Sequence, residues 1–164
     1  MIQAAGPAAK FAAAAVATEL TQQFLAFKLG TEHFAVEILR VLEIRELSPI
    51  TPIPNAPSYV KGVMNLRGTI VPVIDLRMRF GAGEATYNDF TVIIVVSCGS
   101  RYVGLIVDAM SDVLEVRSSD IAPPSDLSLQ VDVMNLAGII RNNDDIILVL
   151  NLDKLLSFEL VAES

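Results

Sequence analysis

The sequence predicts an all-β protein, and three observations lead to this fold class. Short apolar segments recur roughly every 8–12 residues with turn residues between them, which is typical of barrels and sandwiches. One supersecondary unit occurs twice. The run VIIVV at residues 92–96 lacks polar alternation, so both of its faces must be covered, as where two barrels pack together.

The repeat relates residues 61–80 to residues 137–156 without a gap, at a shift of 76 positions (137 minus 61). Each copy contains a glycine, a strand, a polar turn, a second strand and a short helix. Asp75 and its counterpart Asn151 are good N-caps for helices expected at 76–80 and 152–156. A repeated unit of this kind is expected to nucleate its own core in each copy.

The two copies differ in their turns. The first is NLRG at residues 65–68, and the second, RNNDD at 141–145, is a plain solvated turn. We expect the first hairpin tip to display both Leu66 and Arg67. A solvated hairpin arginine is the ordinary alternative, but an apolar residue beside an arginine matches the composition of contact sites.

The other elements follow from the same patterns. Residues 1–20 are expected to form a flexible Ala-rich tail and residues 158–164 a C-terminal tail. A stiff loop is expected at the four prolines between 49 and 57, followed by one helical turn at 58–61. Pro72 confines its strand to a sheet edge or a bulge. The remaining strands are expected at 23–29, 33–36, 41–47, 91–97, 102–107 and 112–116.

Composition excludes several classes of protein. The chain has 164 residues, 52% of them hydrophobic and none of them Trp, so its core must be aliphatic. A net charge of −7 argues against binding to nucleic acid or to an anionic membrane. No apolar run approaches the roughly 20 residues needed to span a bilayer, so no membrane insertion is expected. The FAAAAVA run at 11–17 resembles a signal-peptide core, but its lead-in has Lys10 as its only cation.

Candidates for catalysis or metal binding are few. Cys98 is the only cysteine, so no intramolecular disulfide forms, which fits a reducing cytoplasm, and a structural thiol is expected. His33 is the only histidine and is expected to be a solvated turn residue. An N-cap role explains both Asp75 and Asn151, whereas a carboxylate mechanism explains only the first. We therefore expect no catalytic residues, metal or cofactor.

Surface display is more informative. Glu43 and Arg45 interrupt the apolar strand at 41–47, which is consistent with simple alternation and a polar face in water. The segments around these residues and around Arg67 resemble the signature of CheW-type bacterial chemotaxis coupling proteins, and the resemblance extends over roughly residues 22–157. The matching strings are VLEI (41–44), PNAPSYVKGVMNLRG (54–68), VPVIDLR (71–77), YND (87–89) and VGLIVD (103–108).

The resemblance implies two intertwined five-stranded SH3-like β-barrels within one domain at 22–157. It implies a cytoplasmic, non-catalytic adaptor that links the cytoplasmic tip of methyl-accepting chemoreceptors to the regulatory domain of the histidine kinase CheA. It does not assign the kinase-contacting face. Carried over by position, the receptor-binding residues are Val41, Glu43, Gly62, Arg67, Val103, Gly104, Met110 and Val113. Gly62 is expected to act mainly through backbone geometry.

The resemblance also implies a groove between the barrels. We expect this groove to be edged by Glu43 and Arg67 and to have an aliphatic lining that includes Val41, Val103, Met110 and Val113. Two departures limit the transfer: Asn142-Asn143 replaces Leu66-Arg67 in the second repeat, and the Ala-rich N-terminus has no counterpart. Alternatives are a CheV-like protein or a kinase regulatory domain, which the absence of room for a receiver domain disfavours. An enzyme on a small barrel would need a polar pocket with perturbed carboxylates, and an Sm-like nucleic-acid binder would need a basic face.

Overall fold

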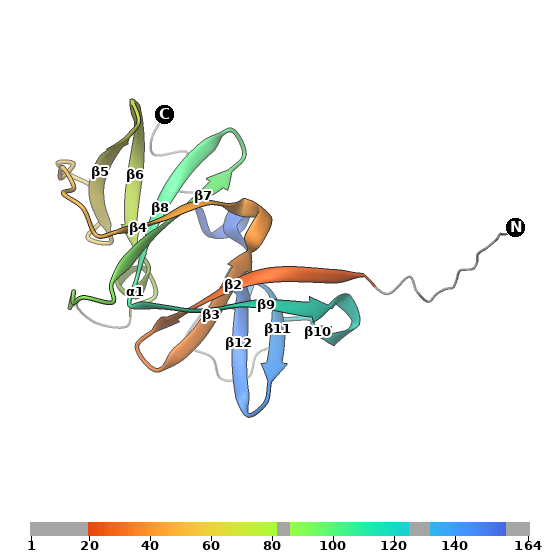
Figure 1. Cartoon of the computed structure of the whole chain (residues 1–164). Coiled ribbons are helices and arrows are strands. Elements are labelled where there is room, and N and C mark those ends of the chain that lie inside the picture. Colours follow the sequence, from red (N-terminus) through yellow and green to blue (C-terminus); the bar gives the residue numbers. More distant parts are fainter. Residues whose placement is uncertain (1–19, 82–85, 125–131, 157–164) are drawn as a thin grey trace, which may run out of the picture.

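Two β-sheets make up most of the computed structural model, which describes residues 20–81, 86–124 and 132–156 (Figure 1). The first sheet has the strand order β4-β7-β8-β6-β5, and the second has the order β10-β11-β12-β3-β2-β9. The strands of the first sheet are β4 (Val41–Glu46), β5 (Val60–Leu66), β6 (Thr69–Asp75), β7 (Val92–Cys98) and β8 (Arg101–Val107). Those of the second are β2 (Thr21–Leu29), β3 (Glu32–Glu37), β9 (Ala109–Arg117), β10 (Ile121–Ala122), β11 (Leu136–Asn142) and β12 (Asp145–Leu150).

Helices are short throughout the described ranges. They are α1 (Leu76–Arg79), the 3₁₀ turns η1 (Ile38–Arg40), η2 (Ser118–Asp120) and η3 (Val133–Asn135), and a helix at residues 152–156. The predicted all-β, SH3-like fold is confirmed, with the two-residue β10 as a sixth strand in the second sheet. In the described residues the two end strands of each sheet do not pair with each other, so both sheets are open. The Thr51–Val63 bridge extends the β5 edge of the first sheet, and β10 pairs with β11 at one edge of the second. The expected tails lie outside the described residues, apart from Leu20, which directly precedes β2.

The sheets exchange strands. β4 follows β3 along the chain but pairs with β7 in the first sheet, and β9 follows β8 but pairs with β2 in the second. Each sheet thus takes one end strand from the segment that follows the hairpin of the other sheet (Figure 1). This exchange is what makes the two halves intertwined, so neither can form its full sheet from a continuous stretch of chain.

The predicted repeat is confirmed in the strand register. Gly62 pairs with Val73 and Gly138 with Val149, in each case just after a one-residue register shift. Each repeated hairpin then adds one parallel neighbour, β8 beside β6 and β3 beside β12. The two halves therefore have the same strand order, which local sequence similarity alone would not guarantee.

Both predicted N-caps are present. The Asp75 carboxylate accepts a hydrogen bond from the Met78 main-chain N at 3.1 Å, and the Asn151 amide oxygen accepts one from the Lys154 N at 3.2 Å. Each cap satisfies a main-chain donor that the first helical turn leaves without a partner. The caps end the second strand of each hairpin and start the helix that follows it.

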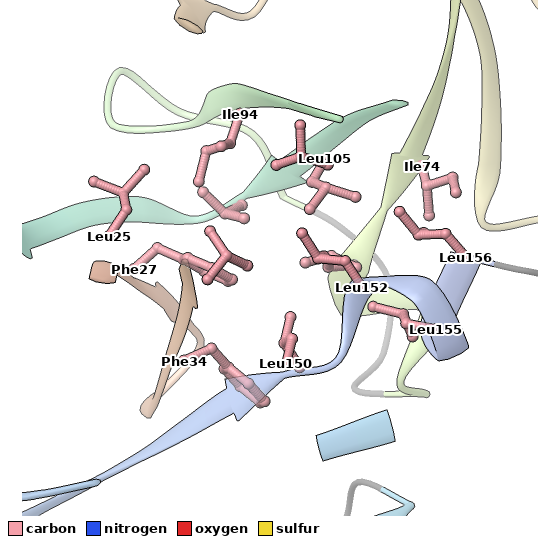
Figure 2. Packing of buried hydrophobic residues seen from close by; sticks show 14 of the residues in the cluster. Leu25, Phe27, Phe34, Ile74, Ile94, Leu105, Leu150, Leu152, Leu155 and Leu156 are labelled. Atoms are coloured by element: carbon pink, nitrogen blue, oxygen red, sulfur yellow. The ribbon is translucent and has the colours of Figure 1, made fainter. Parts of the chain in front are cut away.

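The largest hydrophobic cluster, here called the central core, takes residues from both sheets (Figure 2). Strand β7 explains how the sheets share it. Ile94 and Val96 lie in the central core, while Ile93 and Val95 lie in a second cluster with Met64. Both faces of the VIIVV run are therefore covered, as predicted. Burial of each of these side chains contributes about 2 kcal/mol.

Two expectations for the first hairpin are wrong. Residues 58–61 form no helix, because a turn closed by the Val60 N–H to the Pro57 carbonyl at 2.9 Å leads directly into β5. β6 is not an edge strand but lies between β5 and β8, and the bulge in its pairing falls on the neighbouring β5, between Val60 and Gly62. Pro72 is tolerated there because both main-chain groups of its partner Val63 bond to Thr51, and pairing with β8 begins one residue later.

Candidate functional site and family assignment

The first hairpin tip places Arg67 in an unusual backbone conformation. Arg67 and Gly68 form a two-residue loop between the paired residues Leu66 and Thr69, with φ of 50° and 89°. Positive φ at both loop residues is the pattern of type I′ hairpins, which favour Asn, Asp or Gly at the first position. The Asn65 side chain supports the loop by accepting the Gly68 N–H at 2.7 Å. An arginine in this conformation costs about 1 kcal/mol, which turn formation alone does not explain.

Of the two residues expected to be displayed at the tip, only Arg67 is exposed. Its side chain is 70% exposed, whereas Leu66 is only 3% exposed and packs with Met64. The prediction that Leu66 is displayed is therefore wrong, because the strand alternation of β5 continues through Leu66 into the core. The second tip is exposed from Arg141 to Asp145 as predicted, with φ of 58° at Asn143.

Glu43 of β4 holds the arginine. Arg67 Nη1 lies 3.1 Å from Glu43 Oε1 and donates a hydrogen bond to Oε2 at 3.3 Å. The Glu43 side chain is 24% exposed, and its Oε1 is buried without an aligned hydrogen-bond donor. The ion pair thus fixes the position of the guanidinium over the first sheet. It also leaves the carboxylate dependent on Arg67 for its charge partner.

β4 alternates in the opposite sense to the expected one. Val41, Glu43 and Arg45 are half-buried, while Leu42 and Ile44 are exposed. The expectation of a polar face in water is wrong, because the inward face of β4 meets the Arg67 tip, which partners Glu43. The strand therefore presents two apolar side chains to solvent.

Three of the residues expected at the receptor surface are buried. Val103 is 0% exposed within the central core, so the expectation that it lines an exposed groove is wrong. Gly104 is also buried, and a Cβ there would lie 3.0 Å from Ile93 Cγ2. Gly62 has φ of 141° and faces the Thr51 carbonyl so closely that no Cβ fits. These residues shape the fold beneath the surface.

Val41, Met110 and Val113 lie on β4 and β9, the two strands that the sheets exchange. Val41 of β4 and Met110 of β9 both pack against the central core, and Val113 of β9 is 55% exposed. Within the described ranges no hydrogen bond or ion pair joins Arg67 to β9. The structure therefore brings Arg67 together with Glu43, and it packs Val41 and Met110 against one core.

A hollow of about 430 Å³ lies beside η1, the connection between β3 and β4, and was missed by the sequence analysis. Its lining comes from η1, β2, β9 and the last residue of β3. The lining residues are Thr21, Gln22, Gln23, Glu37, Ile38, Leu39 and Glu115. Leu39 is 91% exposed. The available signal was an apolar pair, Ile38-Leu39, in a connection rather than a strand. The hollow has an aliphatic wall and acidic edges.

The remaining polar groups serve the fold. Asp75 is buried, caps α1 and accepts the Tyr87 hydroxyl at 2.7 Å. Burial, followed by the hydrogen bond to and the charge of Asp75, raises the pKa of Tyr87. Cys98 is buried with Sγ 3.9 Å from the Leu152 carbonyl, as expected for a structural thiol. His33 is half-buried within β3 rather than in the turn, which corrects that expectation.

Neither metal clusters nor spanning helices occur in the part of the chain that the structure describes. No group of three or more His, Cys, Asp or Glu side chains gathers there. No helix there is long and apolar enough to cross a membrane.

Two intertwined SH3-like β-subdomains with an apolar surface and a fixed ion pair define a protein of the binding and scaffolding class. The sequence profile of the CheW-like domain matches residues 23–159. The chain is 40% identical to the chemotaxis protein CheW of Klebsiella aerogenes, with 86% of this chain and 85% of that protein covered. It is 39% identical to CheW of Rhizobium meliloti, with 84% and 89% covered.

A solved structure agrees with these relatives. The crystal structure of the scaffolding protein TtCheW from Thermoanaerobacter tengcongensis is similar to this chain with a TM-score of 0.77 and 34% identity. The similarity covers 83% of this chain and 88% of that one. The chain therefore belongs to the CheW-like family of chemotaxis coupling and scaffold proteins, which are not enzymes.

Proposed function

We propose that this protein links the cytoplasmic tip of methyl-accepting chemoreceptors to the regulatory domain of the histidine kinase CheA, and that it supports receptor control of kinase activity. The proposal places the protein in the cytoplasm, where both of these partner surfaces lie. Family membership supports the general role. The observation that carries the receptor contact is the strained, exposed Arg67 held by Glu43.

The backbone of Arg67 supports a functional role for its side chain. Residues kept in rare backbone conformations persist when the surrounding structure fixes them, and they concentrate at functional sites. The matching tip of the second sheet has Asn143, a residue that suits a positive φ. Only the first tip therefore carries a side chain that the turn disfavours. A partner with an acidic group or a C-terminal helix dipole would engage this guanidinium.

The apolar part of the surface suits an amphipathic helix. Leu39, Val41 and Val113 offer aliphatic contacts near the junction of the sheets, and Glu43 with Arg67 supplies a charged edge. A receptor tip is proposed to lay its apolar face here, with the charges fixing register more than affinity. Val103 and Gly104 are proposed to support this surface from below, and Gly62 to keep the first hairpin close to the proline-rich loop.

Coupling needs reversible contacts. We expect modest affinity for each partner alone and stronger assembly when receptor and kinase bind together, because the second contact then forms at a high effective concentration.

Titration calorimetry with a receptor cytoplasmic fragment and, separately, with the CheA regulatory domain tests the proposal. Val113→Lys should weaken receptor binding about tenfold, which corresponds to about 1.4 kcal/mol, and leave kinase binding unchanged. Arg141→Ala, at the second hairpin tip, is the matched control and should bind both partners normally. The proposal fails if the unaltered protein binds neither partner, or if Val113→Lys binds the receptor fragment as well as the control does.

A further inference from the structure

Two ion pairs lie at matching places in the two halves of the molecule. Arg77 Nη1 lies 3.0 Å from Asp108 Oδ2, and Arg40 Nη2 lies 2.7 Å from Asp153 Oδ1. Arg77 and Asp153 are equivalent in the repeat, because 77 plus 76 is 153. Both lie in the helix that follows a repeated hairpin. Asp108 and Arg40 lie in the connections that carry the chain from one sheet to the other.

The two connections make equivalent contacts. The Asp108 main-chain N donates to the Lys28 carbonyl at 3.1 Å, and Arg40 Nε donates to the Ser97 carbonyl at 3.0 Å. Lys28 and Ser97 lie near the ends of the matching strands β2 and β7. The Asp108 carboxylate also accepts the Gly30 N–H at 2.6 Å. Each connection is therefore bound both to the sheet it enters and to the helix of the sheet it leaves.

The polarity of the two pairs is reversed. In the first sheet the helix supplies the cation Arg77 and the connection supplies the anion. In the second sheet the helix supplies the anion Asp153 and the connection supplies the cation. If the two repeated hairpins changed places, Arg77 would meet Arg40 and Asp153 would meet Asp108. Both contacts would then join like charges.

Such an exchange is a realistic folding error. The hairpins share one register, and β3 and β8 receive them in the same parallel manner. In the second hairpin, Val149 of β12 pairs with Ala35 of β3, 114 positions away (149 minus 35). Gly104 of β8, the residue that holds the place of Ala35 in the first sheet, is only 45 positions away (149 minus 104). Closing the shorter loop costs less entropy, so pairing of β12 with β8 competes with the native pairing early in folding.

We propose that the Arg77–Asp108 and Arg40–Asp153 pairs form a charge key that assigns each repeated hairpin to its own sheet. Both members of the Arg77–Asp108 pair are less than one-third exposed, so water screens that contact only in part. In the second pair Arg40 is 24% exposed but Asp153 is 68% exposed, so that contact is screened more strongly. Ion pairs stabilise the correct assignment and like charges oppose the wrong one. Separate copies of one repeat can therefore fold in a single chain without exchanging places.

Refolding of the double variant Arg40→Asp/Asp153→Arg tests the key. It restores an ion pair in the native fold but gives both helices an arginine and both connections an aspartate. Interrupted-refolding assays should show about a threefold rise in the fraction of misassembled chains, which corresponds to about 0.7 kcal/mol. The control Arg117→Asp/Asp120→Arg reverses an exposed pair outside the repeat and should refold as the unaltered protein does.

The same substitutions in a second parent variant distinguish a charge key from ion pairs that only stabilise the native fold. Arg77→Asp/Asp108→Arg also removes the distinction between the hairpins and should raise misassembly. Adding Arg40→Asp/Asp153→Arg to it restores opposite polarity, so misassembly should fall. The same change thus has opposite signs in the two backgrounds. An effect of the same sign in both, or no effect in either, overturns the proposal.

A neutral variant covers the case in which the reversed pairs do not fold. Arg40→Gln/Asp153→Asn introduces no like-charge contact into the native fold and removes only the second pair. Its misassembled fraction should also rise, because only one hairpin is then directed by charge. An unchanged fraction overturns the proposal.

Discussion

Replacement of Arg67 by asparagine separates the backbone cost of this residue from its proposed role in binding. Asparagine suits a positive φ, so the change should recover about 1 kcal/mol of backbone strain. It also removes the ion pair with Glu43, and such partly exposed pairs contribute about 0.2–1 kcal/mol. The free energy of unfolding should therefore stay within about 0.5 kcal/mol of the original value or rise.

Thermal melts followed by circular dichroism measure this directly. A gain of about 0.5 kcal/mol corresponds to an increase in Tm of about 1–2 °C for a chain of this size. Arg67→Ala is the informative companion, because alanine keeps the left-handed strain and loses the ion pair, so it should be less stable than Arg67→Asn. Both variants should bind a receptor fragment more weakly. If Arg67→Asn instead lost more than about 1 kcal/mol of stability with receptor binding unchanged, Arg67 would be a structural residue and the functional argument would be refuted.

Three further outcomes are expected. Val103→Asp should lose at least about 3 kcal/mol of stability because it buries a charge, whereas Val113→Asp on the exposed face of β9 should lose less than about 0.5 kcal/mol, as denaturant titrations would show. Gly62→Ala should lose more than about 1 kcal/mol in the same assay, since a Cβ there meets a main-chain carbonyl, and equal stability would contradict that geometry. The raised pKa of Tyr87 favours its protonated form in the folded state. This contribution is complete below the ordinary pKa of 10.0 and is lost as pH rises above it, so Tyr87→Phe should flatten the alkaline fall in stability, and parallel pH profiles would contradict this.

Local sequence was enough to predict several elements of this protein. The repeated hairpins, their shared register and the Asp75 and Asn151 caps depend on neighbouring residues and on short-range hydrogen bonds. The unbroken apolar run of β7 showed that both of its faces would be buried. The contrast between the two hairpin tips also directed attention to Arg67 before its backbone conformation was known.

Only the tertiary structure decided which face of each strand points inward. Alternation with a period of two defines two faces but does not say which one meets the core, and a strand at a tip or an edge can present either. For this reason Leu66 was expected outside and is buried, and β4 was expected to expose its charges but exposes Leu42 and Ile44. Val103 was placed on a surface by family position, yet it lies in the central core.

The pattern of residues alone did not predict the exchange of β4 and β9 between the sheets. Each of these strands is read easily from its own residues, and only the family resemblance suggested intertwining. Their partners lie far along the chain, β7 for β4 and β2 for β9. The choice between two similar sheets depends on contacts such as those of Arg40 and Asp108, which join residues that no local pattern connects. The sequence by itself determined the strands and hairpins, whereas the assembled core and these long-range ion pairs determined how the two halves are joined.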